Sequence, residues 1–348
     1  NVRADIYPGN RAWTGRKGNY MKYLELSTTD PYWNLALEAY VFTHMDPDES
    51  YFLLWQIENS ILIGKHQNTI EEINQEFVDA HHIHVLRRLT GGGAVYHDMG
   101  NLNFSFIVRQ NTENSYNFRF FVEPVLEVLH SLGVPAEFTG RNDLTIHGLK
   151  FSGNAQCAWH GRLLHHGCLM LDANVDYLSE ALRVKKVKYE SRGIKSVHSR
   201  VTCINDHLEQ KLTMEEFKKK LRDAVLSRED VQPLTLREED YRGIRKIRDE
   251  QFATWEWNYG RSPSYNLKRE RKFPAGLVTA YLQVQAGHIQ SVRFFGDFFG
   301  NQNLSQLEQA MRHLPLDNQL PVLLARLHPE RYMKGIAADE VASLILNE

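Results

Sequence analysis

The chain has 348 residues, a length that favours two domains over one. Hydrophobic residues make up 42% and charged residues 24%, which are ordinary values for a globular protein. The formal net charge is −2, which excludes bulk attraction to nucleic acid or to an anionic membrane, so any basic site must be local. We therefore expect neither a nucleic acid nor a membrane as a partner.

Cysteine usage and the first residues indicate a cytoplasmic protein. Cys157, Cys168 and Cys203 show neither a CxxC pair nor a Cys/His ligand spacing, so the sequence predicts no structural zinc and no disulfide framework. A low, odd count is typical of a reducing compartment. Residues 1–20 are polar and lack the apolar stretch of a signal peptide. We interpret them as a flexible leader or the remnant of an expression tag, and we expect Met21 to be the native start.

The N-terminal half alternates strands with helices in no regular order. Asp30 followed by Pro31 is typical of a helix start, because an aspartate caps the first turn and proline fits its first position. Two dipeptides, His147-Gly148 and His160-Gly161, interrupt a long strand-like region. The predicted strands are 22–27, 51–56, 60–65, 83–86, 102–109 and pieces of 143–171, and the predicted helices are one from 31, one at 70–80 and one at 117–132. Only three residues separate 51–56 from 60–65, so we expect those two strands to form a hairpin.

The C-terminal half is predicted to contain a helix, a domain boundary and a second small domain. Thr213 and Glu216 have the spacing of a capping box ahead of a lysine-rich helix that runs to about 227. We place a boundary near 262, followed by a hairpin around Ala286-Gly287 and helices at 305–313, 318–327 and 338–346. Because no βαβ rhythm is present, we predict an α+β fold with a mostly antiparallel sheet at 21–262 and a small α+β domain at 263–348.

A glycine stretch carries the first candidate site. RRLTGGGAVYHD spans residues 87–98 and places three glycines after two arginines. Without side chains, backbone N–H groups can converge on a phosphate or carboxylate, and Arg87 and Arg88 can add bidentate donors. The alternative is a mobile loop with two solvated arginines. The return to strand pattern on both sides favours the anion site.

Two further segments carry polar residues in strand-like surroundings. GRNDLTIHGLKFSGNAQ (140–156) contains Lys150, which either extends to the surface or holds an anion in a cleft. In the same segment, Asp143 either caps a strand or positions a metal–phosphate unit. HHGCLML (165–171) begins with two histidines whose side chains must face opposite sides of a strand, so the pair does not form a metal site. The basic run 183–201 is either a solvated face or a flap over an anionic ligand.

Together these segments resemble the lipoate–protein ligase A family, in its bacterial form with an accessory C-terminal domain. The resemblance rests on RRLTGGGAVYHD, GRNDLTIHGLKFSGNAQ, HHGCLML, GIKSVHSRV and WEWNYGRSPSYN, in the order in which the family has them, and it covers Met21 to the C-terminus. It implies a sheet-centred catalytic domain related to biotin ligases and class II synthetases.

The resemblance also implies the reaction and its partners. The family activates (R)-lipoate with ATP and Mg²⁺ to lipoyl-AMP, releases pyrophosphate, and transfers the lipoyl group to a lysine of an acceptor protein. The expected acceptors are lipoyl domains of 2-oxoacid dehydrogenase E2 subunits and the glycine-cleavage H protein, and the enzyme is expected to be a monomer. One competing hypothesis is an octanoyl- or lipoyl-transferase that uses a cysteine thioester without ATP, and another is a non-catalytic lipoate carrier.

Site residues follow from the resemblance, motif by motif. Lys150 is the expected catalytic residue, in contact with both lipoate and the α-phosphate. Asp143 is the expected metal ligand. The remaining expected residues are Arg88, Gly93, Ala94, Val95 and Tyr96 for ATP and the adenylate, Gly92, Gly93 and His166 for lipoate, and Lys185, Lys186, Lys195 and Ser196 for the flap.

Overall fold

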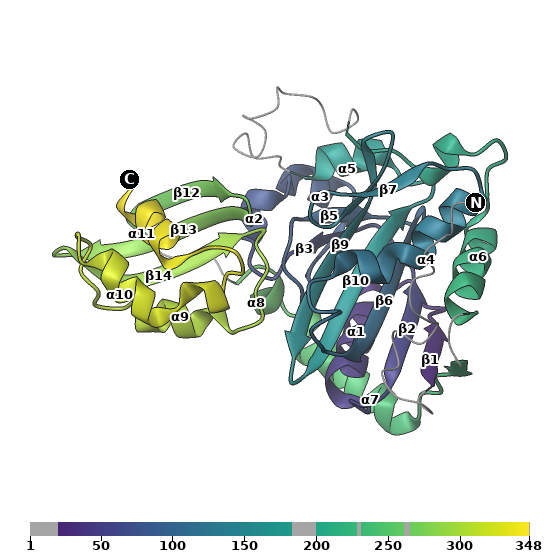
Figure 1. Cartoon of the computed structure of the whole chain (residues 1–348), viewed down its shortest axis with the longest axis horizontal. Coiled ribbons are helices and arrows are strands. Elements are labelled where there is room, and N and C mark those ends of the chain that lie inside the picture. The colour runs from purple at the N-terminus through teal and green to yellow at the C-terminus, as the bar shows by residue number, and fades with distance from the viewer. Residues whose placement is uncertain (1–19, 183–199, 228–230, 261–264, 348) are drawn as a thin grey trace, which may run out of the picture. The chain divides into compact units, whose positions relative to one another are not determined.

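The structure of the protein, a computed structural model, describes residues 20–182, 200–227, 231–260 and 265–347. They form two compact units (Figure 1). The first unit falls within Asn1–Glu58, His97–Val175 and Val197–Arg248, and the second within Asn59–Tyr96, Asp176–Ser196 and Asp249–Glu348. The predicted leader up to residue 19 and the predicted flap residues Lys185, Lys186, Lys195 and Ser196 lie outside the described residues. The boundary near 262 stays a prediction.

An eight-stranded sheet forms the centre of the first unit, with the strand order β11-β1-β2-β6-β10-β9-β8-β7. Strands β11, β1 and β2 run parallel, and every other neighbouring pair is antiparallel, which confirms the predicted mostly antiparallel sheet. The strands are β1 (Met21–Glu25), β2 (Ser50–Trp55), β6 (Asn101–Arg109), β7 (Ala136–Thr139), β8 (Asp143–Ile146), β9 (Leu149–Trp159), β10 (Arg162–Met170) and β11 (Val231–Pro233).

Helices cover both faces of this sheet because its central strands are buried on both sides. Phe104 and Phe106 of β6 belong to the main apolar core, together with residues of α4 and α6. Ser105 points to the opposite face, where it donates a hydrogen bond to Glu38 of α1. The helices of this unit are α1 (Pro31–His44), α4 (Phe118–Ser131), η3 (Ile204–His207), α6 (Met214–Leu226) and α7 (Glu238–Ile247). Helix α5 (Val175–Ala181) belongs to the second unit except for its first residue.

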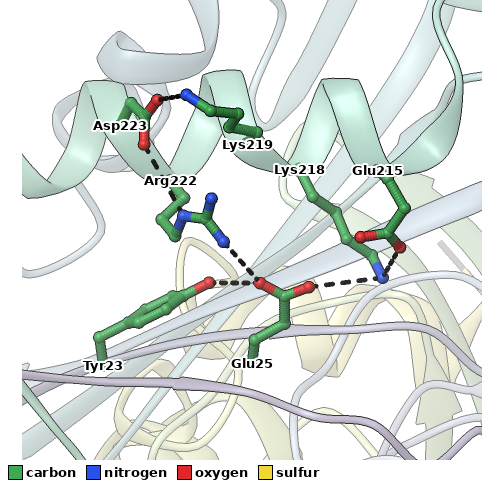
Figure 2. A network of polar contacts seen from close by, with 7 residues as sticks. All are labelled: Tyr23, Glu25, Glu215, Lys218, Lys219, Arg222 and Asp223. Carbon is green, nitrogen blue, oxygen red and sulfur yellow. Dashed lines mark hydrogen bonds and ion pairs between the residues drawn. The ribbon is translucent and has the colours of Figure 1, made fainter.

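A polar network fastens α6 to the edge of the sheet (Figure 2). Glu25 of β1 accepts a hydrogen bond from the Tyr23 hydroxyl at 2.8 Å. The same carboxylate pairs with Arg222 at 3.3 Å and with Lys218 at 3.6 Å, both on α6. Burial, and then the neighbouring Glu25, raise the pKa of Tyr23, so this hydroxyl stays a donor at physiological pH. The network therefore fixes the rotation of α6 about its axis.

Three local predictions are confirmed by backbone geometry. Asp30 caps α1 by accepting from the amides of Tyr32 and Trp33, and Thr213 forms the predicted capping box with Glu216. Both histidine–glycine breaks are two-residue turns with positive φ, at 50° and 78° for His147-Gly148 and at 46° and 76° for His160-Gly161. Such turns match the twist of the strands they join, so β8, β9 and β10 run as consecutive antiparallel neighbours.

The second unit contains two three-stranded sheets. The first sheet has the strand order β4-β3-β5, and the second has the order β12-β13-β14. The second sheet is antiparallel and forms an apolar core with α9, α10 and α11. The strands of this unit are β3 (Ser60–Ile63), β4 (His84–Arg87), β5 (Val95–His97), β12 (Leu267–Phe273), β13 (Gly276–Gln285) and β14 (His288–Gly296). Its helices are α2 (Thr69–Glu72), α3 (Gln75–Ala80), α8 (Trp255–Asn258), α9 (Leu304–Ala310), α10 (Leu320–Leu327), η5 (Pro329–Arg331) and α11 (Ala338–Leu346). The π-helical turn Arg248–Phe252 comes before α8 in the chain.

Two predicted elements are wrong. The hairpin of 51–56 with 60–65 does not form, because β2 is buried between β1 and β6 in the large sheet, whereas β3 pairs with β4 in another sheet. A short connection between two apolar runs does not reveal which sheet each strand joins. The helix predicted at 70–80 is divided at Ile73, which forms an isolated bridge with Leu182, and Asn74 then caps α3. None of the helices among the described residues is long and apolar enough to span a membrane.

Candidate functional site

Arg87, the first arginine of the glycine stretch, is a buried structural tie. Only 1% of it is exposed. Its Nη1 donates to the carbonyl oxygens of Gly64, Lys65 and Gln67. Its Nε donates to the carbonyl of Trp257 at 2.9 Å. Because this guanidinium donates to backbone carbonyls of two distant chain segments, its role is to hold those segments together and not to bind a ligand.

Arg88, the second arginine, shapes the glycine bend itself. Its Nη2 donates to the carbonyl oxygens of Gly91 at 2.7 Å and Gly93 at 2.8 Å, and its Nη1 donates to Leu62 at 2.9 Å. The Nε donates to Thr90 Oγ1 at 3.0 Å. Because the carbonyl oxygens turn toward this cation, the bend has a defined backbone conformation. A nucleotide contact for Arg88 stays a prediction.

The three glycines have different surroundings. A Cβ on Gly91 would lie 2.4 Å from the carbonyl oxygen of Phe298, and Gly92 has a φ of +95°, which disfavours any other residue. Among the residues that the structure describes, none has an atom within 4 Å of the position that a Cβ on Gly93 would take. The described residues therefore leave space on this side of Gly93, and a phosphate or carboxylate cradle there stays a prediction.

The residues after the glycines return to regular structure. Val95 begins β5, and Tyr96 packs in the small apolar core that includes Ile61 and Ile63 of β3. The Tyr96 hydroxyl donates to Asn59 at 2.9 Å, which satisfies the polar group on a ring that is only 4% exposed. The bend is thus held between two strands of one sheet. Arg88, Gly92, Gly93, Ala94, Val95 and Tyr96 therefore lie together in one segment of the second unit.

Lys150 lies in the first unit, at the start of β9, next to a bulge. Thr145 pairs with Lys150 while Leu144 pairs with Ser152, so Phe151 is an extra residue in β9. The bulge lets the Lys150 ammonium lie over Gly153, at 3.2 Å from the position of a Cβ there, and reach Asp143 at 2.8 Å. The side chains of Lys150 and Asp143 are 39% and 38% exposed, so this ion pair adds little stability and leaves the ammonium accessible.

The two histidines face opposite sides of β10, as predicted. His165 is fully buried and stacks on Phe121 of α4 at 4.6 Å. Burial, and then the neighbouring His166, hold the pKa of His165 well below its usual value, so this ring is neutral. His166 turns to the other face, where its Nδ1 lies 3.0 Å from Glu38 Oε1. His166 thus has a fixed orientation that the sequence alone did not predict.

Sequence reasoning missed the buried polar residues that support these groups. Glu38 lies on α1 and is 1% exposed; it also accepts from Ser105 at 2.5 Å, and Ser105 in turn accepts from Trp55 at 2.9 Å. Asn258 accepts from the Arg87 amide at 2.8 Å. The segment WEWN was noticed only as a motif, and nothing in its spacing indicated that it holds residue 87. A glutamate within a helix that is otherwise buried was the one available signal for Glu38.

The predicted metal ligand does not belong to a metal cluster. Across residues 20–182, 200–227, 231–260 and 265–347, no group of three His, Cys, Asp or Glu side chains is placed to hold an ion. The Asp143 carboxylate is ion-paired with Lys150. Asp143 as a ligand of a magnesium ion that ATP phosphates also hold stays a prediction.

Two of the three cysteines, Cys157 and Cys203, do not have the surroundings of an activated nucleophile. Cys157 is buried. Burial above all, with added repulsion from Asp206, raises the pKa of Cys203 to about 11. Its Sγ donates to the carbonyl of Ala173 at 3.5 Å. A thiol that stays protonated at neutral pH is a poor nucleophile, which counts against Cys203 as the carrier of a thioester.

Comparisons with known proteins identify the chain. The family model described as the lipoyl protein ligase A/B catalytic domain matches residues 30–226, and the one described as the bacterial lipoate protein ligase C-terminus matches residues 262–345. The chain is therefore an enzyme of the ligase class. It belongs to the lipoate–protein ligase family, in the bacterial form with an accessory C-terminal region, as the sequence predicted. Lipoate-protein ligase LplJ of Bacillus subtilis is 47% identical over 91% of this chain and 97% of its own length.

Solved structures agree with the fold. Plasmodium falciparum LipL1 in complex with lipoate superposes with a TM-score of 0.77 over 95% of this chain and 100% of that chain, at 23% identity. The bipartite ligase of Thermoplasma acidophilum, described with its E2 lipoyl domain, gives 0.62 at 27% identity over 72% of this chain and 99% of that chain. Lipoate-protein ligase A bound with ATP gives 0.60 at 25% identity over 70% and 98%.

Proposed function

We propose that this enzyme activates (R)-lipoate with ATP and then transfers the lipoyl group to a lysine of an acceptor protein. In the first step a lipoate carboxylate oxygen attacks the α-phosphorus of ATP, and the bond to pyrophosphate breaks. In the second step the acceptor amine attacks the carbonyl carbon of lipoyl-AMP, AMP leaves, and the amine loses a proton. A relative of similar fold described as bound with ATP, and another described as in complex with lipoate, support both substrates.

The glycine bend is the observation that carries the proposal. Gly93 has open space on its Cβ side, and Arg88 fixes the carbonyl oxygens of Gly91 and Gly93. Backbone N–H groups held in this way suit a polyphosphate, because the donors need no reorganisation as charge develops. We assign Gly92 to Tyr96 to the walls of the ATP and lipoyl-adenylate site, with Gly92 and Gly93 also next to the lipoate carboxylate.

Lys150 is the proposed catalytic residue. Carboxylate and α-phosphate are both negative, so their approach needs a cation that contacts both, and the ammonium of Lys150 is accessible on the sheet. Its partner Asp143 would release it when the substrates arrive. His166, oriented by Glu38, is assigned to the lipoate site. Magnesium would enter with ATP, whose phosphates supply most of its oxygen ligands, and Asp143 is the side chain proposed to add one more.

The proposed acceptors are lipoyl domains of 2-oxoacid dehydrogenase E2 subunits and the glycine-cleavage H protein, and we propose that the enzyme acts as a monomer. The structural relative described with its E2 lipoyl domain supports this class of acceptor. The amine must be neutral to attack, which favours transfer at a pH nearer to the pKa of lysine.

Lipoate-dependent exchange of labelled pyrophosphate into ATP tests the proposal, with an E2 lipoyl domain then added to measure lipoylation. We expect exchange to require lipoate and lipoylation to require ATP. Lipoylation from octanoyl or lipoyl donors without ATP, abolished when the three cysteines are replaced by serine, would instead establish the thioester transferase. Lipoate binding with neither exchange nor lipoylation would establish a carrier.

A further inference from the structure

The segment Gly296–Gly300, which follows β14 in the C-terminal region, packs on the glycine bend within the second unit. The Gly296 amide donates to the carbonyl of His66 at 2.8 Å. The ring of His66 stacks on Phe298 at 5.0 Å with an interplanar angle of 10°. The carbonyl oxygen of Phe298 lies 2.4 Å from the position that a Cβ on Gly91 would take. The bend and this C-terminal segment are therefore in direct contact.

Phe299 is a buried residue of that contact. It is 4% exposed, yet among the residues that the structure describes it is not part of the apolar cluster that includes Phe294 and Phe298. Its ring atoms lie 3.3 Å from a Cβ position on Gly91 and 3.7 Å from one on Gly92. The ring thus rests on the bare backbone of the bend.

Phe299 has a rigid support behind it. Its carbonyl oxygen accepts from the Lys334 amide at 2.8 Å. A Cβ on the neighbouring Gly300 would collide with the carbonyl oxygen of Tyr332 at 1.8 Å, so the chain is tightly packed there. Asp297 accepts from the Leu277 amide at 2.5 Å, which ties the segment to β13. The ring is therefore held against the glycines by the C-terminal sheet.

Three consecutive glycines need such support, because glycine has more backbone freedom to lose than any other residue. Arg88 fixes two carbonyl oxygens of the bend, and Phe299 limits the movement of Gly91 and Gly92. We propose that Phe299 is a positioning residue that preorganises the glycine bend for the phosphates of ATP, so that the C-terminal region sets the affinity for ATP. This inference rests on the proposed function of the bend and names the residue that controls it.

Replacement Phe299→Ala should raise the KM for ATP by about tenfold, since a bend that must be ordered on binding loses affinity. The KM for lipoate should rise less than the KM for ATP, because only Gly92 and Gly93 of the bend are also assigned to the lipoate carboxylate. The rate of transfer at saturating lipoyl-AMP should stay within about twofold, since ordering of the bend changes binding and not the transfer step. The variant Phe299→Leu keeps apolar contact and should recover most of the affinity. If Phe299→Ala does not fold, Phe299→Leu alone decides, with an expected rise of two- to threefold.

The matched control is Phe294→Ala. Phe294 is 1% exposed, lies on β14 and packs in the apolar core of the C-terminal sheet. Both alanine variants should lower the melting temperature, but only Phe299→Ala should change the KM for ATP. Equal effects of the two variants on ATP affinity would overturn the inference, because the cause would then be general destabilisation.

Hydrogen exchange of the peptide that spans residues 88–95 separates this inference from the proposed function. The amides of Gly91 to Gly93 should exchange faster in Phe299→Ala than in Phe294→Ala, whether or not the enzyme forms an adenylate. Unchanged exchange would overturn the positioning role even if the wild-type enzyme activates lipoate. Faster amide exchange in Phe299→Ala, combined with a wild-type enzyme that shows no pyrophosphate exchange, would support the contact and contradict the proposed function.

Discussion

Replacement Gly93→Ala should separate the chemistry of the glycine bend from its folding. A Cβ at this position would meet no described residue within 4 Å, and Gly93 is not among the glycines of positive φ. Glycine-to-alanine changes at such positions stabilise a protein by about 0.4–1 kcal/mol, because the unfolded chain loses freedom. The new methyl group would nevertheless occupy the space through which an anion reaches the backbone.

The expected loss of activity is large. Removing one preorganised donor from a developing negative charge costs about 3–4 kcal/mol, or roughly 10²–10³ in rate. Urea unfolding should show a stability equal to or above that of the wild type, while lipoate-dependent pyrophosphate exchange should fall by about that factor. Gly92→Ala is the contrasting variant, since its φ of +95° and the Arg88 Nη2 at 2.9 Å predict destabilisation as well. Wild-type exchange by Gly93→Ala would refute the anion cradle.

Three further outcomes follow from buried groups. Arg87→Lys should lower the free energy of unfolding by about 3–6 kcal/mol, because at least two charged hydrogen bonds of about 1.5–3 kcal/mol each are lost. An unchanged urea midpoint would contradict the structural role of Arg87. The pKa of His165 is lower in the folded than in the unfolded protein, so the unfolded chain binds the extra proton first. Below the unfolded pKa of about 6.5, the free energy of unfolding should therefore decrease by about 1.4 kcal/mol for each pH unit. His165→Phe should flatten that slope in pH-dependent unfolding, and an unaltered slope would assign it to another group. With a pKa of about 11, Cys203 should resist iodoacetamide at pH 8 in the native protein, and rapid alkylation would revive the thioester route.

Local chemistry made much of the fold predictable. Dipeptides such as His147-Gly148 carry their turn in their own backbone preferences, and the capping residues Asp30 and Thr213 bond within one helical turn. These interactions depend on neighbours in the sequence, so the sequence suffices to find them. The pairing of β2 and β3 depends on partners far along the chain, and there the predicted hairpin was wrong.

In the candidate site, too, features that depend on neighbouring residues were predictable and features that depend on distant residues were not. The sequence predicted a glycine bend beside two arginines and a lysine on a strand, because residue types in a short motif reveal them. It did not distinguish the two arginines. Arg87 donates to the carbonyl oxygens of Gly64, Lys65, Gln67 and Trp257, whereas Arg88 donates to the bend. Which acceptors surround a guanidinium is decided by tertiary packing. The roles of Arg88, Lys150 and His166 toward substrates stay predictions.

Direct detection of the intermediate is the most decisive measurement. The enzyme is incubated with ATP, Mg²⁺ and (R)-lipoate in the absence of acceptor, and the bound small molecules are identified by mass spectrometry. We expect stoichiometric lipoyl-AMP in the wild-type enzyme and none in Lys150→Ala, which should fold normally because its ion pair with Asp143 is half exposed. Unreacted lipoate and ATP in the wild-type sample, or lipoyl-AMP at the wild-type level in Lys150→Ala, would contradict the mechanism.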